Sequence, residues 1–157
     1  MKRILFIALV AALALCFFGC AKDKPVTAAP DEIVLDITLQ TDDTVYTAGI
    51  DYFMDGTFLG GMAANHADNS PLSPGEHHVF RLGPEQFPAG TEDLRGFGFL
   101  VKLSADPDPQ ADVQAIADSV GFTETNGIDP FGAAFGNVYR FTVTGSFESG
   151  FRLEKTE

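Results

Sequence analysis

The sequence predicts an all-β protein, an antiparallel β-sandwich of about seven or eight strands with Ig-like architecture. Short runs in which apolar and polar residues alternate predict strands that each bury one face. These runs recur at spacings of roughly 8–15 residues and are separated by turn-forming Gly, Asn, Asp and Pro, as in sandwich proteins. The chain has no Trp and only two Cys, so "Ig-like" describes architecture and not the Cys–Trp–Cys core of immunoglobulin domains.

The first three strands are predicted over residues 33–40, 45–54 and 57–64. In the second strand, Gly49 is expected to mark a bulge, since an isolated glycine weakens regular pairing. Asp55-Gly56 separates the second and third runs, which predicts a type I′ hairpin because both turn positions need positive φ. The apolar face of the first strand consists of Ile33, Leu35, Ile37 and Leu39.

A turn-rich loop over residues 65–76 precedes a short strand at 77–82. Residues 83–96 show no regular pattern, and alternation resumes at 97–104. The stretch 106–136 supports two interpretations: a short helix around 109–120, or a strand that returns beside residues 97–104.

The last part of the sandwich begins with a turn at Asn126-Gly127. A strand is predicted over residues 137–144, with Tyr139, Phe141 and Val143 facing inward. Gly145-Ser146 is expected to turn the chain into a final strand over residues 147–153.

The first 20 residues have the layout of an export signal. Lys2 and Arg3 precede an uncharged apolar run over residues 4–18, which is followed by Gly19-Cys20. A run of this length is too short to cross the ~30 Å hydrocarbon core comfortably. The sequence therefore divides into a signal peptide (1–19), a flexible tether rich in Pro and small residues (20–31) and a β-sandwich domain (32–157).

This segment resembles the signal peptides of bacterial lipoproteins, through Gly19, Cys20 and the polar tether that follows. The resemblance implies a lipoprotein with a diacylglycerol thioether and palmitate on Cys20, held outside the cytoplasm in the cell membrane or the outer membrane. Phe17 and Phe18 depart from the family, which prefers Leu and a small residue there. An ordinary secretory signal cut after Ala21 is the alternative, and it would discard Cys20.

Cysteine and charge usage exclude several classes of function. Once residues 1–19 are removed, Cys20 is the only thiol, so no disulfide forms within the domain. The remaining chain has 8 basic and 22 acidic side chains, a net charge of −14. This charge excludes nucleic-acid binding and membrane attachment through a basic patch, because phosphates would be repelled.

The domain also resembles small single-domain β-sandwich lipoproteins of uncharacterised function. The residues that carry this resemblance are Tyr52-Phe-Met-Asp-Gly, Asn69-Ser-Pro-Leu, Gly75-Glu76 and the stretch from Phe135 to Gly145. They are strand and turn motifs, so the resemblance implies a fold and transfers no functional residue.

Two groups of residues are weak metal candidates, and no metal or other cofactor is expected. His66, Asp68, His77 and His78 combine zinc-type donors, but adjacent His77 and His78 should point to opposite faces of a strand. Asp106, Asp108 and Asp112 could begin a Ca²⁺ loop, although the glycine and glutamate of an EF-hand are absent. The alternative interpretation is that the three aspartates form a solvated acidic turn and that the histidines are ordinary surface residues.

The expected function is a non-enzymatic binding or structural module of the cell envelope, with an unknown protein or glycan partner. One alternative is a Ca²⁺- or carbohydrate-binding sandwich that uses its end loops. Another is a small hydrolase that uses His66 and His78, although no G-x-S-x-G motif is present.

Overall fold

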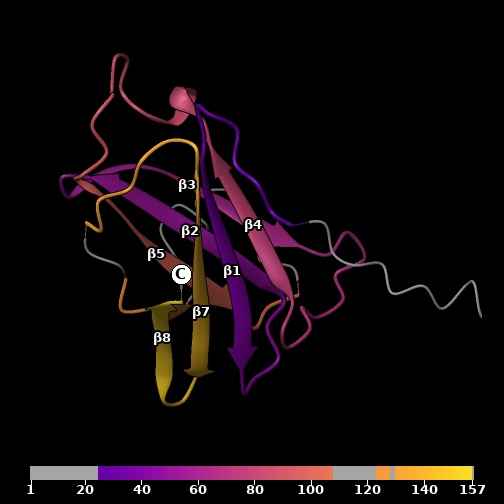
Figure 1. The fold of residues 1–157 in the computed structure, drawn as a ribbon. Coiled ribbons are helices and arrows are strands. Elements are labelled where there is room, and N and C mark those ends of the chain that lie inside the picture. The colour runs from indigo at the N-terminus through magenta and orange to yellow at the C-terminus, as the bar shows by residue number, and fades with distance from the viewer. Residues whose placement is uncertain (1–24, 108–122, 128–129, 157) are drawn as a thin grey trace, which may run out of the picture.

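The structure, a computed structural model, describes residues 25–107, 123–127 and 130–156. Within this part the strands form two four-stranded sheets that pack face to face (Figure 1). Sheet 1 has the strand order β4-β1-β7-β8, and sheet 2 has the order β3-β2-β5-β6. The predicted all-β sandwich is confirmed.

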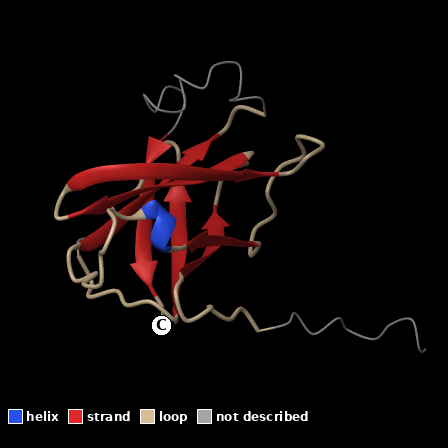
Figure 2. Cartoon of the chain, turned by 90° about the horizontal axis from the view of Figure 1, so that it is seen from above, coloured by secondary structure: helices blue, strands red, loops and turns tan. Residues whose placement is uncertain are grey.

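Nearly all regular structure in the described chain is strand, as Figure 2 shows. The one helical element there is a 3-10 turn, η1 (Pro84–Gln86). The helix-or-strand question around residues 109–120 lies outside the described residues. Sheet 1 contains β1 (Ile33–Thr41), β4 (His77–Leu82), β7 (Asn137–Ser146) and β8 (Gly150–Lys155). Sheet 2 contains β2 (Thr47–Met54), β3 (Thr57–Asn65), β5 (Phe97–Ser104) and β6 (Thr123–Glu124).

One strand pair departs from the antiparallel expectation. β1 and β7 run parallel, with Ile33 opposite Asn137 and Thr41 opposite Gly145. The other strand pairs are antiparallel. Alternation in a sequence determines which face a side chain occupies but not the direction of the neighbouring strand, so this pair could not be predicted.

The core lies between the sheets and is largely aromatic at its centre. Phe141 of β7 is fully buried. Its ring meets Phe99 of β5 edge-to-face at 4.8 Å and Phe131 at 5.8 Å between centroids. Edge-to-face contacts of this kind add to the hydrophobic gain of burying phenyl rings.

The hairpin predicted at Asp55-Gly56 is confirmed, with φ of 50° and 76° at the two turn residues. The predicted bulge at Gly49 is wrong: Gly49 pairs in register with Ala63, and the irregularity falls between Tyr52 and Phe53. Tyr52 lies across from Gly60, where an added Cβ would sit 2.6 Å from the tyrosine hydroxyl oxygen. Gly60 therefore leaves the room that the Tyr52 ring occupies.

The turn between the last two strands lies later than predicted. β7 continues through Gly145 and Ser146, the turn covers residues 147–149, and β8 begins at Gly150. The Ser146 hydroxyl oxygen accepts the Ser149 N–H at 3.0 Å. This local hydrogen bond closes the turn after Ser146, whereas the sequence predicted the turn at Gly145-Ser146.

Residues 25–30, here called the N-terminal strap, run back beside β4 (Figure 1). The Arg81 guanidinium donates to the Thr27 carbonyl at 3.1 Å. On the outer face of β1, Val34 is 0 % exposed and Asp36 is 3 % exposed, although the sequence predicted one buried face. Pro25 and Val26 line a cavity together with Asp36, so the strap contributes to covering this second face.

Candidate functional site

The two adjacent histidines of β4 point to opposite faces of sheet 1, as predicted. His77 lies on the outer face, where its Nδ1 is 2.8 Å from Oδ1 of the buried Asp36. The Arg140 Nε is 3.5 Å from the other oxygen of the same carboxylate. His78 is buried on the inner side, with 6 % of its surface exposed. The two imidazoles therefore cannot serve one site.

A second group, here called the Glu76 cluster, contains His66, Ser70, Glu76 and His78. The His66 ring bonds the Glu76 Oε1 through Nε2 and the Ser70 hydroxyl through Nδ1, both at 2.8 Å. The other Glu76 oxygen accepts the Ser73 N–H at 2.8 Å. Glu76 thus closes the loop over residues 66–76 by bonding both its start and its middle.

His78 approaches the same carboxylate from the protein interior. Its Nε2 is 3.9 Å from the Glu76 Oε1, too far for a hydrogen bond. That nitrogen has no hydrogen-bond partner and is shielded from solvent.

The predicted metal candidates do not assemble into one site. Asp68 accepts the Ser70 N–H at 3.0 Å and so shapes the loop. Among the described residues, no group of three His, Cys, Asp or Glu side chains is arranged to hold a metal ion. Asp106 is exposed, while Asp108 and Asp112 lie outside the described residues.

The two histidines of the Glu76 cluster have pKa values displaced in opposite directions. The hydrogen bond to Glu76 raises the pKa of His66 above the usual 6.5. Burial lowers the pKa of His78 below that value, and attraction to Glu76 only partly opposes this effect. Partial burial raises the pKa of Glu76, but hydrogen bonds from Ser73 and His66 outweigh it, so the pKa lies below its usual value.

We expect this difference to be visible in a pH titration of the ring signals by NMR. His66 should protonate above pH 6.5 and His78 below it. Replacing Glu76 by Gln should lower the pKa of His66 because the anionic acceptor is lost. If both rings titrate together in the native protein, the proposed geometry around Glu76 is wrong.

These shifts also give the direction of the pH effect on stability. His78 binds a proton more tightly in the unfolded chain than in the folded chain, because its pKa is lowered by folding. This residue therefore destabilises the fold as the pH falls below 6.5. His66 acts in the opposite sense, because the folded state binds its proton more tightly and loses that advantage as the pH rises through its raised pKa.

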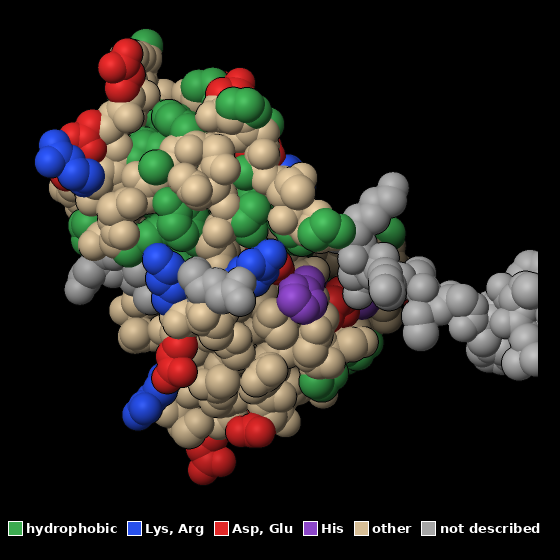
Figure 3. All heavy atoms as spheres, in the orientation of Figure 1, with side chains coloured by type: hydrophobic (Ala, Val, Ile, Leu, Met, Phe, Trp, Pro, Cys, Tyr) green, Lys and Arg blue, Asp and Glu red, His purple; other side chains and the backbone are tan. Residues whose placement is uncertain are grey.

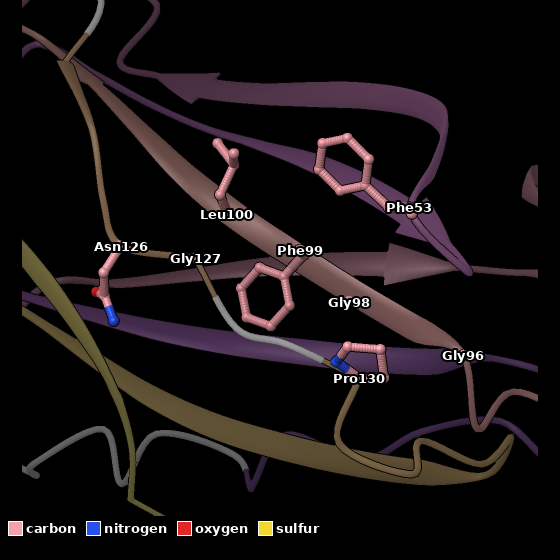
Figure 4. A pocket seen from close by; sticks show the side chains of 9 residues that line it. Phe53, Gly96, Gly98, Phe99, Leu100, Asn126, Gly127 and Pro130 are labelled. Carbon is pink, nitrogen blue, oxygen red and sulfur yellow. The ribbon is translucent and has the colours of Figure 1, made fainter.

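A groove with a largely apolar lining lies beside β5 in sheet 2. We define the sheet-2 groove by Phe53, Gly96, Gly98, Leu100, Asn126 and Pro130, and its volume is about 190 Å³. Figure 4 shows Phe53 and Leu100 on neighbouring strands, with Asn126 and Pro130 approaching from the chain that follows β6. Glycines in the floor leave room that larger side chains would fill.

A polar hollow of about 480 Å³ adjoins this groove and shares Gly96 and Pro130 with it. Its other lining residues are Asp55, Asp93 and Arg95. Hydrogen bonds from Arg95 lower the pKa of Asp93 to about 2. At Gly96 an added Cβ would lie 2.0 Å from the Asp55 carboxylate, so the Asp55 side chain would have to move.

Sequence reasoning missed the sheet-2 groove because its residues come from three separate segments. Phe53 and Leu100 lie on the faces of β2 and β5 that point away from the core. Phe58, whose ring packs edge-to-face on Phe53 at 5.7 Å, is 55 % exposed. Large apolar residues at the outward positions of two alternating strands were the signal that could have indicated this surface.

No protein-family model matches the chain, and no curated protein matches it. Among solved structures, it is similar to listeriolysin O (TM-score 0.36, 6 % identity), with 80 % of this chain and 22 % of the toxin covered. The membrane-binding domain of pneumolysin gives a TM-score of 0.33 and 9 % identity, with 81 % of this chain and 96 % of that chain covered. Intermedilysin bound to human CD59 gives 0.36 and 6 %, with coverage of 80 % and 24 %.

The chain therefore spans about a quarter of the length of the full toxins that it matches. Likeness at these TM-scores defines neither a family nor a function. In the part of the chain that the structure describes, no helix is long and apolar enough to cross a membrane.

Proposed function

We propose that the protein is a lipid-anchored, extracytoplasmic binding module of the cell envelope, without enzymatic activity, and that the sheet-2 groove is its binding site. The export-signal layout that ends at Cys20 supports the anchor. The observation that carries the binding role is an open apolar groove with a polar hollow beside it. Apolar pockets with a few convergent polar groups are typical of ligand sites.

The lining favours a protein segment over a sugar as the ligand. In the sheet-2 groove, Asn126 is the one polar side chain among the defining residues, and its Oδ1 already accepts the Leu153 N–H at 2.8 Å. A sugar would need several polar partners, whereas an apolar anchor side chain needs only the walls of the groove. The adjoining carboxylates Asp55 and Asp93 and the net charge of the chain favour a basic residue next to that anchor.

Cys20→Ser is expected to release the protein from the membrane fraction or to block its maturation. The substitution removes the thiol that would carry the lipid while keeping the size of the side chain. The measurement is fractionation of cells with detection of the full chain, and Cys16→Ser is the matched control, which should remain with membranes. Unchanged membrane association of the Cys20 variant would show that this residue is not the anchor.

The binding role is tested with a displayed library of random peptides selected on the domain. We expect the selected peptides to share an aromatic or aliphatic residue next to Lys or Arg. Leu100→Glu places a charge in the sheet-2 groove and should weaken their binding at least about tenfold, the equivalent of ~1.4 kcal/mol.

Val79→Glu is the matched control for this test. Val79 is 39 % exposed on the other sheet, so the substitution adds the same charge at an exposed apolar position away from the groove. Peptide binding that is equally sensitive to both substitutions would contradict the assignment. Selection of no peptide, together with binding on a glycan array that Leu100→Glu abolishes, would favour the carbohydrate alternative.

A second candidate, a small hydrolase, is favoured by one observation in the Glu76 cluster. Ser70, His66 and Glu76 form a hydrogen-bonded chain in the order of nucleophile, base and acid. The sequence hypothesis also used His78, but its Nε2 is 3.9 Å from the Glu76 carboxylate and does not hydrogen-bond to the chain. Ester hydrolysis that is lost in Ser70→Ala and kept in Ser73→Ala would support this candidate, and the absence of any such activity would end it.

A further inference from the structure

The N-terminal strap is bonded to the outer face of sheet 1 at Thr27, and Glu32 fixes the chain just after it. Thr27 accepts a hydrogen bond from Arg81 of β4, and Arg81 also pairs with Glu32. The Ala29 N–H donates to the Glu32 carboxylate at 2.7 Å, and the Gly136 N–H donates to the Glu32 carbonyl at 2.8 Å. The strap is therefore part of the domain as far as its first described residues, Pro25 and Val26, which line the cavity over Asp36 and His77.

The length of chain between the strap and the lipid site limits how far the domain can move. Five residue steps separate Cys20 from Pro25. Even fully extended, five steps reach at most about 18 Å. Because Pro25 lies over the outer face of sheet 1, that face is the part of the domain held nearest to the lipid.

The same face has a charge balance unlike the rest of the molecule. The register places Arg81, Arg140 and Arg152 on it with the carboxylates of Asp36 and Glu154, and the Glu32 carboxylate joins them by pairing with Arg81. The three arginines and three carboxylates of this face therefore balance in charge. His77 lies on it as well, and Figure 3 shows basic and histidine side chains over the middle of this side. The whole chain has 22 acidic against 10 basic residues, so this is a face that an anionic bilayer repels little.

We propose that the outer face of sheet 1 lies against the bilayer, so that the sheet-2 groove on the opposite side points away from the membrane. This orientation rests on the proposed anchor at Cys20. The partner of the face is the headgroup region of an anionic lipid bilayer, which contacts it through Arg81, Arg152 and the exposed Val79. The domain is then presented at a defined angle, with its binding groove accessible to proteins outside the cell.

The test uses the chain that begins at Cys20, with its thiol coupled to a maleimide lipid in a nanodisc. The nanodisc contains anionic lipid and a second lipid whose headgroup carries gadolinium. Methyl NMR signals report the distance to the bilayer surface through paramagnetic broadening. Val79 on sheet 1 and Leu100 on sheet 2 are natural probes. The two sheets are ~10 Å apart, and paramagnetic broadening falls with the sixth power of the distance from gadolinium. The Val79 signal should therefore be broadened at least about tenfold more than the Leu100 signal.

The control variant carries twenty Gly and Ser residues between Lys24 and Pro25, which frees the domain from the short connection. Its broadening should become weaker and lose most of the difference between the two probes. Equal broadening of Val79 and Leu100 in the native chain, or stronger broadening of Leu100, would overturn the proposed orientation. Because the lipid is attached chemically, this result does not depend on whether cells modify Cys20, which the Cys20→Ser fractionation tests separately.

Discussion

Phe141→Ala is expected to lower the free energy of unfolding by about 3–5 kcal/mol, the usual cost of replacing a buried Phe by Ala. Phe141 is 0 % exposed and lies on β7, between β1 and β8 in sheet 1. Its ring touches Phe99 of the opposite sheet, so the substitution opens a cavity where the two sheets meet. Chemical denaturation of the native chain and the variant measures the difference.

The matched control is Phe58→Ala, which removes the same ring from an exposed position. Phe58 is 55 % exposed and contacts Phe53 at one edge, so its loss should cost less than about 1 kcal/mol. If Phe141→Ala costs no more than this control, the ring cluster between the sheets is not the centre of the core.

Gly145→Ala is expected to destabilise the protein by about 3 kcal/mol or more, since two penalties combine at this residue. Its φ is 106°, a conformation that residues with a side chain rarely adopt. An added Cβ would lie 2.3 Å from the Gly150 carbonyl oxygen across the hairpin. β7 and β8 would have to separate at their last pairs, and thermal unfolding would report the loss.

Gly150→Ala separates the two penalties within the same hairpin. Gly150 also has a positive φ, of 83°, but an added Cβ there would meet nothing within 4 Å. Only the backbone conformation is then penalised, at about 1–2 kcal/mol. Equal effects of the two substitutions would contradict the close approach of the strands at Gly145.

The strands could be predicted wherever the sequence pattern is local. Apolar alternation located β4 and β5 with the bounds that the structure has, and Asp55-Gly56 identified its hairpin because positive φ is encoded by those two residues themselves. The opposite orientations of His77 and His78 followed from the two-residue period of a strand. In each case the physical cause lies within a few residues of the feature.

Most of the missed features depend on residues far apart in the chain; the late turn after β7 is the local exception, closed by the Ser149–Ser146 hydrogen bond. The burial of Asp36 requires residues from other segments, and the sheet-2 groove requires residues 126 and 130 beside Leu100. The sequence also suggested that residues 20–31 are a tether, because a short Pro-rich segment is typical of linkers. That pattern does not reveal a hydrogen bond between Thr27 and Arg81.

The parallel pairing of β1 and β7 determines the order in which the sandwich can be completed. β1 lies between β4 and β7 in sheet 1, and its partner residues in β7 begin only at Asn137. When the chain becomes available for folding from its N-terminus, residues up to 137 and beyond must therefore be available before β1 can pair with β7. Closing so long a loop slows folding. β1 therefore has no neighbour until β4 (His77–Leu82) is available, and only one neighbour until β7 is available.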